Sequence, residues 1–267
     1  MLLLDFKVMR LALRPIFLLS ALALIGLTAC TNPTDEQRAS GEPFDPNERS
    51  NRKMHQFNLG VDKVIFRPAS TGYTSVIPDP IIESVGSFAE NLSMPRVMVN
   101  GLLQGDLKTA GIALSRFVIN TTVGFAGLAD VATNFEIPQV DADFGQTLHV
   151  WGFKEGAYLE LPFFGPSNER DAAGLVMDLL TNPLTYYVHN PIDNAGVFAE
   201  VLDRMGDRGR YSATVDSILY ESADSYAQAR LIYLQNRRFE LAGSGDDAYS
   251  DPYTDVYADP YEDPYAE

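Results

Sequence analysis

The 267-residue sequence has little of what catalytic, metal-binding or disulfide-linked proteins use. Its single cysteine excludes an internal disulfide and a zinc cluster built from cysteines. The three histidines, His55, His149 and His189, are far apart and form no H-x-x-x-H or H-x-x-E-H zinc motif. No G-x-S-x-G nucleophile motif and no G-x-x-x-x-G-K-[ST] phosphate loop occurs. Asp141 and Asp143 form an acidic pair that we interpret as solvated. We therefore expect no enzyme activity, no metal and no cofactor.

Basic residues are also scarce. Lys and Arg number 20 against 36 Asp and Glu, which gives a formal net charge of −16. Nucleic-acid binding needs clustered Lys and Arg, so we expect no nucleic-acid partner. Apolar residues make up 46% and charged residues 21%, close to a globular average, which excludes a wholly disordered chain and a polytopic membrane protein. The length suits one large domain or two small ones.

A long hydrophobic run is missing as well. The uncharged run from Pro15 to Ala29 has 15 residues, whereas a membrane-spanning helix needs about 20. Basic residues precede it, as in a secretory signal peptide, although Met9 is an alternative start. The run ends in Leu27-Thr28-Ala29-Cys30, which resembles the lipobox of bacterial lipoproteins, where cleavage before the cysteine precedes its acylation. We predict a signal peptide over residues 1–29 and lipidation at Cys30; the alternative is an ordinary signal peptide or anchor with a chance cysteine. Thr31, in place of an Asp, favours sorting to the outer membrane.

The rest of the chain predicts a mostly α protein with a minor strand content. Residues 30–46 are polar and rich in proline, which is typical of a tether. The domain over residues 47–240 has apolar spacing, caps and breakers that place helices at 47–66, 79–92, 95–104, 106–118, 144–151, 168–180, 192–206 and 212–240. Arg67-Pro68 is expected to end the first helix, and Asp106 to cap the fourth. Arg237 and Arg238 suit the end of the last helix. The segment Gly156–Gly165 alternates between glycines and predicts a short hairpin.

Two segments leave alternatives open. Phe117–Ala129 has 13 residues without a charge, and it is either a buried core segment or a segment that lies in a membrane interface or lines an apolar path. The tail, residues 241–267, repeats Asp-(Pro/Val)-Tyr-x, and from Ser244 onward it has eight acidic residues and no Lys or Arg. Because its prolines forbid a regular helix, we predict a disordered tail; the alternative is a docking arm for a basic partner.

Several short motifs together resemble the MlaA (VacJ) family of outer-membrane lipoproteins. Their order and spacing hold over about 45–240, with Ser50 as a departure where the family often has an aromatic residue. The motifs are Asp45-Pro46, Asn51-Arg52, Phe57-Asn58, Arg67-Pro68, Tyr73, Asn91, Pro95, Asn100, Leu102-Leu103-Gln104-Gly105, Arg116-Phe117, Asn120, Gly124, Gly127-Leu128-Ala129-Asp130-Val131-Ala132, Phe144-Gly145-Gln146-Thr147-Leu148, Trp151-Gly152, Gly156-Ala157-Tyr158, Leu161-Pro162, Gly165-Pro166-Ser167 and Arg170-Asp171.

The resemblance implies a single ring-like helical domain that is embedded in the inner leaflet of the outer membrane, faces the periplasm and contains an amphipathic channel. Proteins of this kind remove mislocalised phospholipids from the outer leaflet and pass them to a soluble periplasmic carrier, beside trimeric porins. An inner-membrane ABC transporter supplies the energy, which agrees with the missing nucleotide motif. The alternatives are a structural envelope lipoprotein that acts through protein contacts and an envelope enzyme that acts on lipid.

A path for phospholipid needs an apolar wall with a few polar groups for the head group. Arg116, Asn120 and Lys154 are candidates to meet the phosphate, although Arg116 also suits a structural ion pair. The full set of candidate lipid-path residues is Arg116, Phe117, Asn120, Phe125, Lys154, Tyr158, Phe163 and Phe164.

Overall fold

The computed structural model describes residues 33–34, 37, 42–181 and 193–242, and these are mostly helical. The helices are α3 (Glu48–Val61), η1 (Asp62–Phe66), α4 (Arg67–Val76), α5 (Asp79–Gln104), α6 (Leu107–Thr122), α7 (Val131–Asn134), α8 (Phe144–Val150), α9 (Glu169–Thr181), α11 (Asp193–Arg210), α12 (Ser212–Asp216), η2 (Ser217–Glu221) and α13 (Ser225–Ala242). Strands β1 (Tyr158–Leu161) and β2 (Gly165–Asn168) pair antiparallel, with Leu161 opposite Gly165. The prediction of a mostly α fold with one short hairpin is confirmed.

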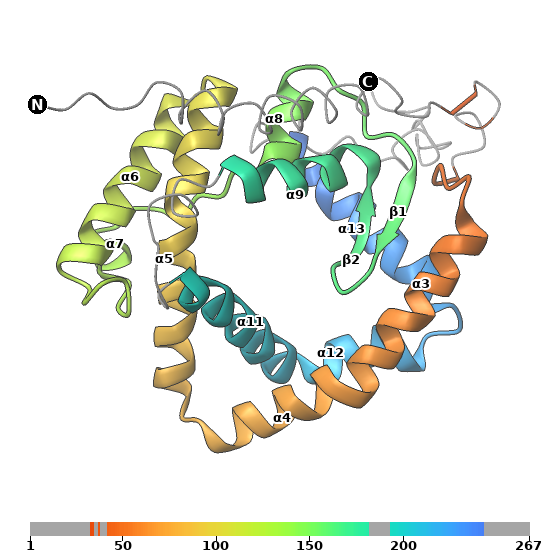
Figure 1. Cartoon of the computed structure of the whole chain (residues 1–267), viewed down its shortest axis with the longest axis horizontal. Coiled ribbons are helices and arrows are strands. Elements are labelled where there is room, and N and C mark those ends of the chain that lie inside the picture. Colours follow the sequence, from red (N-terminus) through yellow and green to blue (C-terminus); the bar gives the residue numbers. More distant parts are fainter. Residues whose placement is uncertain (1–32, 35–36, 38–41, 182–192, 243–267) are drawn as a thin grey trace, which may run out of the picture.

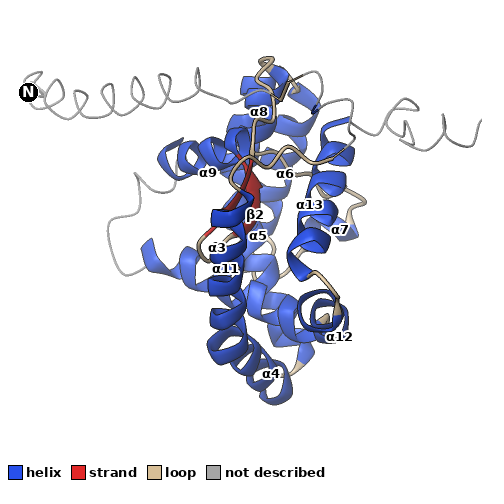
Figure 2. Ribbon diagram, turned by 90° about the vertical axis from the view of Figure 1, so that its right-hand side faces the viewer, coloured by secondary structure: helices blue, strands red, loops and turns tan. Residues whose placement is uncertain are grey.

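The helices are arranged as a ring. In Figure 1, α5, α4 and α3 follow one another around the periphery, and the hairpin, α8, α9 and α13 complete the circuit. Helix α11 packs against α4 and α5 on the inner side, and α6 packs against the outer side of α5. Seen from the side, the ring is built almost entirely of helices, and β1–β2 is the only sheet in the described part of the chain (Figure 2). The buried core is divided into small clusters, the first of them around Met94 and Val97.

The prediction that Arg67-Pro68 ends the first helix is wrong. The helical path continues to Val76 through η1, a π-helical turn in which the Arg67 N–H donates to the Asp62 carbonyl, five residues back. A proline within an α-helix clashes with the carbonyl four residues earlier and lacks an N–H. The wider turn relieves that conflict and places Pro68 in the first turn of α4, where proline is tolerated.

The prediction of a break before Pro95 is also wrong. Helix α5 runs unbroken for 26 residues and contains Pro95 in its interior. A proline in a helix interior destabilises the helix by about 3 kcal/mol. The neighbouring Met94 and Val97 are fully buried, and burial of each such side chain stabilises the fold by about 1.5–3 kcal/mol. Tertiary burial therefore outweighs the local signal. Helix α5 ends at Gly105, with φ of 77°, and the Asp106 side chain accepts from the Thr109 N–H at 2.9 Å, which confirms the predicted cap.

The predicted last helix, 212–240, is divided. It consists of α12, η2 and α13, and Ser222, with ψ of 144°, takes the chain out of helical geometry between η2 and α13. Arg237 does not lie in the last turn of α13, which has no basic residue. Its side chain is buried and contacts Asp143 and Asp171 instead, so tertiary ion pairs and not the helix dipole determine its position. Asn182-Pro183 and Asn190-Pro191, two Asn-Pro pairs of the kind that predicts turns, lie outside the described residues.

Candidate functional site

The outward face of α6 is apolar. The face packed against α5 holds Ala110, Ala113, Arg116 and Asn120, all of them buried. The opposite face exposes Leu107 (72% exposed), Leu114 and Val118. Between residues 107 and 129 the charges are Lys108 and the buried Arg116. A continuous apolar face of this kind is typical of a surface that contacts a partner or a membrane.

The loop after α6 continues the same surface. Val123, Phe125 (80% exposed) and Leu128 are open, whereas Phe117 packs against the core and Asn120 is buried, so the segment Phe117–Ala129 is partly core and partly surface. Phe125 and Ala126 have φ of 51° and 63°, a left-handed conformation held by hydrogen bonds such as that from the Gly127 N–H to the Asn120 carbonyl at 2.8 Å. A Cβ at Gly124 would lie 2.2 Å from the Ala129 carbonyl oxygen, so the loop requires glycine there. The backbone thus holds an aromatic ring out from the protein.

Further large apolar side chains are exposed around the ring. They lie on α9 and α11 as well as at the hairpin tip: Val176, Leu179, Val197, Phe198, Val201, Phe163 and Phe164. No helix among the described residues is long and apolar enough to cross a membrane. Many apolar side chains of the described residues are therefore exposed, although they are not gathered into a spanning segment.

A cavity of about 300 Å³ lies within the ring, because its walls come from elements on opposite sides of it. Leu161, Phe164 and Leu175 supply apolar surface from the hairpin and α9. Arg96 enters from α5 and Arg204 from α11, where its guanidinium carbon lies 5.9 Å from the centre of the Phe164 ring. The cavity combines apolar side chains with cationic groups and is therefore amphipathic.

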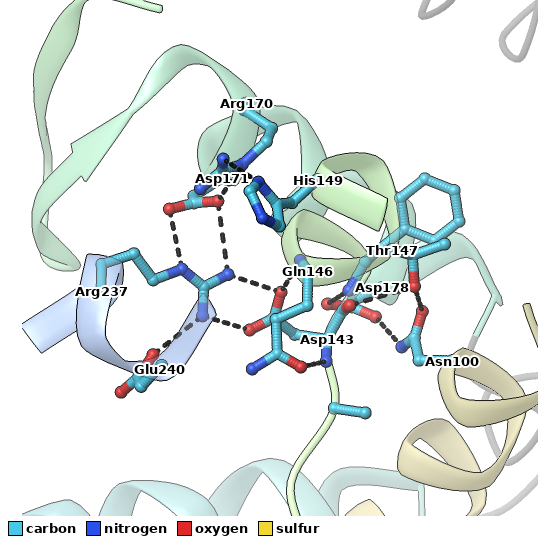
Figure 3. A network of polar contacts seen from close by, with 12 residues as sticks. Asn100, Asp143, Gln146, Thr147, His149, Arg170, Asp171, Asp178, Arg237 and Glu240 are labelled. Carbon is cyan, nitrogen blue, oxygen red and sulfur yellow. Dashed lines mark hydrogen bonds and ion pairs between the residues drawn. The ribbon is translucent and has the colours of Figure 1, made fainter. Parts of the chain in front are cut away.

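Several lining residues of this cavity belong to a network of ion pairs and hydrogen bonds, which Figure 3 shows from close by. Arg237 donates to both oxygens of Asp143 at 2.8 Å, to Asp171 at 3.0 Å and to Glu240 at 3.0 Å. Burial alone would raise the pKa of Asp171, but Arg237 and Arg170 outweigh it and hold that pKa below its usual value. Asp143 also caps α8 by accepting from the Gln146 N–H at 2.8 Å, so our interpretation of it as a solvated carboxylate is wrong.

Asp178 extends this network toward α5. Burial raises its pKa, and hydrogen bonds from the Phe144 N–H at 3.1 Å and the Asn100 amide at 2.8 Å only partly oppose that rise. Arg96 approaches Asp178 at 3.5 Å and Asp141 at 3.8 Å, distances too long for strong pairs. Arg204 is about half exposed and pairs with Glu200 on its own helix. Arg96 and Arg204 are therefore the cavity cations least neutralised by the protein.

The structure places Arg116 away from any accessible surface. Its side chain is 0% exposed and donates to Asp130 at 2.9 Å, Glu90 at 3.2 Å and the Ile137 carbonyl at 2.8 Å. This is the structural ion-pair alternative, and it leaves no face for a lipid phosphate. Asn120 is buried in the same cluster, where it donates to Asp130 at 3.0 Å and accepts from the Ala132 N–H.

The other predicted residues are spread over three places. Phe117 packs against the core cluster around Met94, and Tyr158 is buried with its hydroxyl donating to Glu160 at 2.5 Å. Phe125, Phe163 and Phe164 are exposed, and only Phe164 lines the ring cavity. Lys154 is exposed at a separate cavity, and Cys30 lies outside the described residues. Sequence reasoning missed Arg96 and Arg204, since nothing in their local pattern shows that α5 and α11 present them to one cavity.

The fold and site define a class: a mostly helical, ring-shaped protein with an exposed apolar face on α6 and an amphipathic interior cavity. Comparison with known proteins identifies the family. A family model described as MlaA lipoprotein matches residues 43–240, so the chain belongs to the MlaA lipoprotein family and the resemblance seen in the sequence is confirmed. In the described part of the chain, no group of three or more His, Cys, Asp or Glu side chains is arranged to hold a metal.

Relatives agree with this assignment. The chain is 34% identical to the intermembrane phospholipid transport system lipoprotein MlaA of Escherichia coli (strain K12), over 85% of this chain and 90% of that protein. It is 30% identical to the protein of the same name from Haemophilus influenzae, over 84% of this chain and 89% of that protein. A solved structure reported under the words "Structural basis for maintenance of bacterial outer membrane lipid asymmetry" superimposes with a TM-score of 0.63 at 31% identity, covering 74% of this chain and 98% of that one.

Proposed function

We propose that this protein is an outer-membrane lipoprotein that removes mislocalised phospholipid from the outer leaflet and passes it to a soluble periplasmic carrier. The single observation that carries the proposal is the amphipathic cavity within the ring, together with the exposed apolar face of α6 on the outside of it. The names of its relatives in Escherichia coli and Haemophilus influenzae support the same role. In this proposal Cys30 carries the lipid anchor, the ring lies in the inner leaflet on the periplasmic face, and a trimeric porin is its neighbour.

The cavity chemistry suits a phospholipid. Acyl chains leave water favourably when they contact apolar side chains, here Leu161, Phe164 and Leu175. The phosphate must keep a hydrogen-bonding or charged partner when it leaves water, because an unpaired buried charge is costly. In our proposal Arg96 and Arg204 are those partners, in place of Arg116. The planar guanidinium of an arginine can bind phosphate through two N–H groups.

The outer face of α6 and the loop after it complete the proposal. Leu107, Leu114, Val118 and Phe125 would contact acyl chains of the inner leaflet, which removes their apolar surface from water. This contact would position the ring at the depth of the lipids that it handles. A ring embedded in this way needs no spanning helix, in agreement with the lengths of the described helices.

The test measures phospholipid in the outer leaflet of cells that lack this protein. Expression of the wild-type chain should restore a low level, whereas Cys30→Ala should not. Arg204→Ala should restore it only partly, and Arg210→Ala is the matched control because Arg210 is exposed on the same helix and does not line the cavity. If cells without the protein accumulate no outer-leaflet phospholipid, the lipid-removal role is excluded and a role through protein contacts takes its place.

A further inference from the structure

A second cavity, of about 470 Å³, lies between the end of α8, the start of α9 and the end of α13, and we call it the α8–α13 cavity. Its lining residues include His149, Phe153, Lys154, Arg170, Arg238 and Leu241. Apart from Arg170, which approaches the ion network, these residues have no part in the ring cavity described above. The proposed lipid path therefore leaves this cavity without a role.

The polar groups of the α8–α13 cavity favour an anion. Arg170 is 2% exposed; its Nε donates to Asp171 at 3.0 Å, and its Nη2 is buried with no partner among the described residues. A buried donor without an acceptor is costly, so its presence indicates a missing acceptor. Lys154 is exposed beside it, and Arg238 pairs with Glu155 at 2.7 Å. The lining therefore has three cations against one carboxylate.

The remaining lining is apolar. Phe153 contributes an aromatic ring from the loop after α8, and Leu241 and Ala242 contribute the end of α13. A ligand that fits both parts carries a carboxylate or similar anion close to an aromatic or aliphatic group. The occupant is thus expected to be acidic and apolar at the same time.

A segment of that chemistry begins where the cavity ends. Ala242 lines the cavity, and the chain continues into five tyrosines at four-residue steps, from Tyr249 to Tyr265, each of which follows an aspartate by two residues. We propose that this acidic tyrosine repeat, residues 249–267, binds in the α8–α13 cavity, with an aspartate carboxylate at the cations and a tyrosine ring against Phe153 and Leu241. The proposal does not depend on lipid transport. The family model ends at residue 240, so the repeat is an addition to the matched domain.

The reach and the energetics are favourable. The seven residues from Ala242 to Tyr249 span at most about 24 Å when extended. A short flexible connection keeps a tethered segment at an effective concentration in the millimolar range. A single repeat therefore needs only millimolar affinity to be bound much of the time, and five tyrosines offer several alternative registers. Any other ligand of the cavity would have to displace the tail.

The experiment uses the full chain in its membrane, with photoreactive benzoylphenylalanine in place of Phe153. After illumination we expect an adduct with the chain's own residues 249–267, identified by mass spectrometry. The same probe in place of Phe135, an exposed residue after α7, is the control position and should give no such adduct. Lys154→Glu should lower the yield about threefold or more, in the range expected for an exposed ion pair, whereas Lys108→Glu should not.

Several results would overturn the proposal. They are an absent adduct with residues 249–267, an equal adduct from the Phe135 position, a yield unaffected by Lys154→Glu, and an adduct with lipid, a bound phosphate ester or another protein instead. A second measurement is independent of the probe. Deletion of residues 243–267 should speed amide hydrogen exchange over Gly152–Gly156, and unchanged exchange counts against the docking.

Discussion

Replacement of Arg116 by alanine tests whether this residue is structural. Its guanidinium is fully buried between Glu90 and Asp130 and donates to the Ile137 carbonyl. Breaking a buried ion pair by removing one partner costs about 3–5 kcal/mol. Asp130 retains hydrogen bonds from Asn120 and Thr133, and Glu90 is one-third exposed, so both carboxylates keep some solvation. We therefore expect the lower end, about 3 kcal/mol.

For a domain of this size, about 3 kcal/mol corresponds to a fall in melting temperature of roughly 6–12 °C. Burial already raises the pKa of Glu90, and Arg116 opposes that rise. Without Arg116 this pKa rises further, and a group with a raised folded pKa loses stability as pH increases through it. The destabilisation of Arg116→Ala should therefore be larger at pH 8 than at pH 5.

The assay is thermal unfolding of the detergent-solubilised lipoprotein, with Lys108→Ala as the control on an exposed position of the same helix. The control should melt within about 2 °C of the wild type, because surface substitutions usually change stability by less than 0.5 kcal/mol. If Arg116→Ala also melts like the wild type and instead slows lipid transfer, the structural reasoning is refuted and Arg116 returns as a lipid ligand.

Three further predictions concern packing, capping and pH. Gly174→Ala should lower the free energy of unfolding in urea by about 1–3 kcal/mol, because the added Cβ would lie 2.4 Å from the Gly145 nitrogen where α8 meets α9. Gly111→Ala is the control: it has open space around it and should raise that free energy by up to about 1 kcal/mol. Asp106→Ala should lose about 0.5–2 kcal/mol of helix capping, and Asp106→Asn should retain most of it in the same measurement. Because burial raises the pKa of Asp178, the wild type should lose stability relative to Asp178→Asn as pH rises from about 4 to 7; a constant difference between their urea midpoints would contradict this.

Local signals in the sequence predicted local structure. Asp106 was recognisable as a helix cap because a cap needs only a short polar side chain three residues before a free N–H. The paths through Pro68 and Pro95 were not predictable, since a wide turn and distant packing remove conflicts that the local pattern contains. The sequence thus predicted the helical class and the hairpin but divided α5 where tertiary burial keeps it whole.

The site was less predictable than the fold. Arg116 stands in an apolar stretch and suggested a lipid ligand, but its partners Glu90 and Asp130 come from other segments and enclose it. Arg96 and Arg204 are 108 positions apart and meet at one cavity only because α11 folds back along α5. On α6 the apolar residues divide between the core, as Ala110 does, and the surface, as Leu114 and Val118 do, because hydrophobic spacing does not show what a face contacts.

The wide turn η1 has a consequence for how the chain tolerates changes in length. The helical path from Glu48 to Val76 contains one residue more than a regular α-helix of the same course would need, and that residue lies in η1. Removal of one residue from η1 would leave Thr74 facing Gly209 on α11. These two residues are in close contact, since a Cβ added to Gly209 would lie 2.5 Å from the Thr74 side chain. The same removal in the middle of α5 would turn every later side chain about 100° around the helix axis. The shortened turn would, however, return Pro68 to an ordinary helix interior, so a deletion in η1 is accommodated only together with Pro68→Ala.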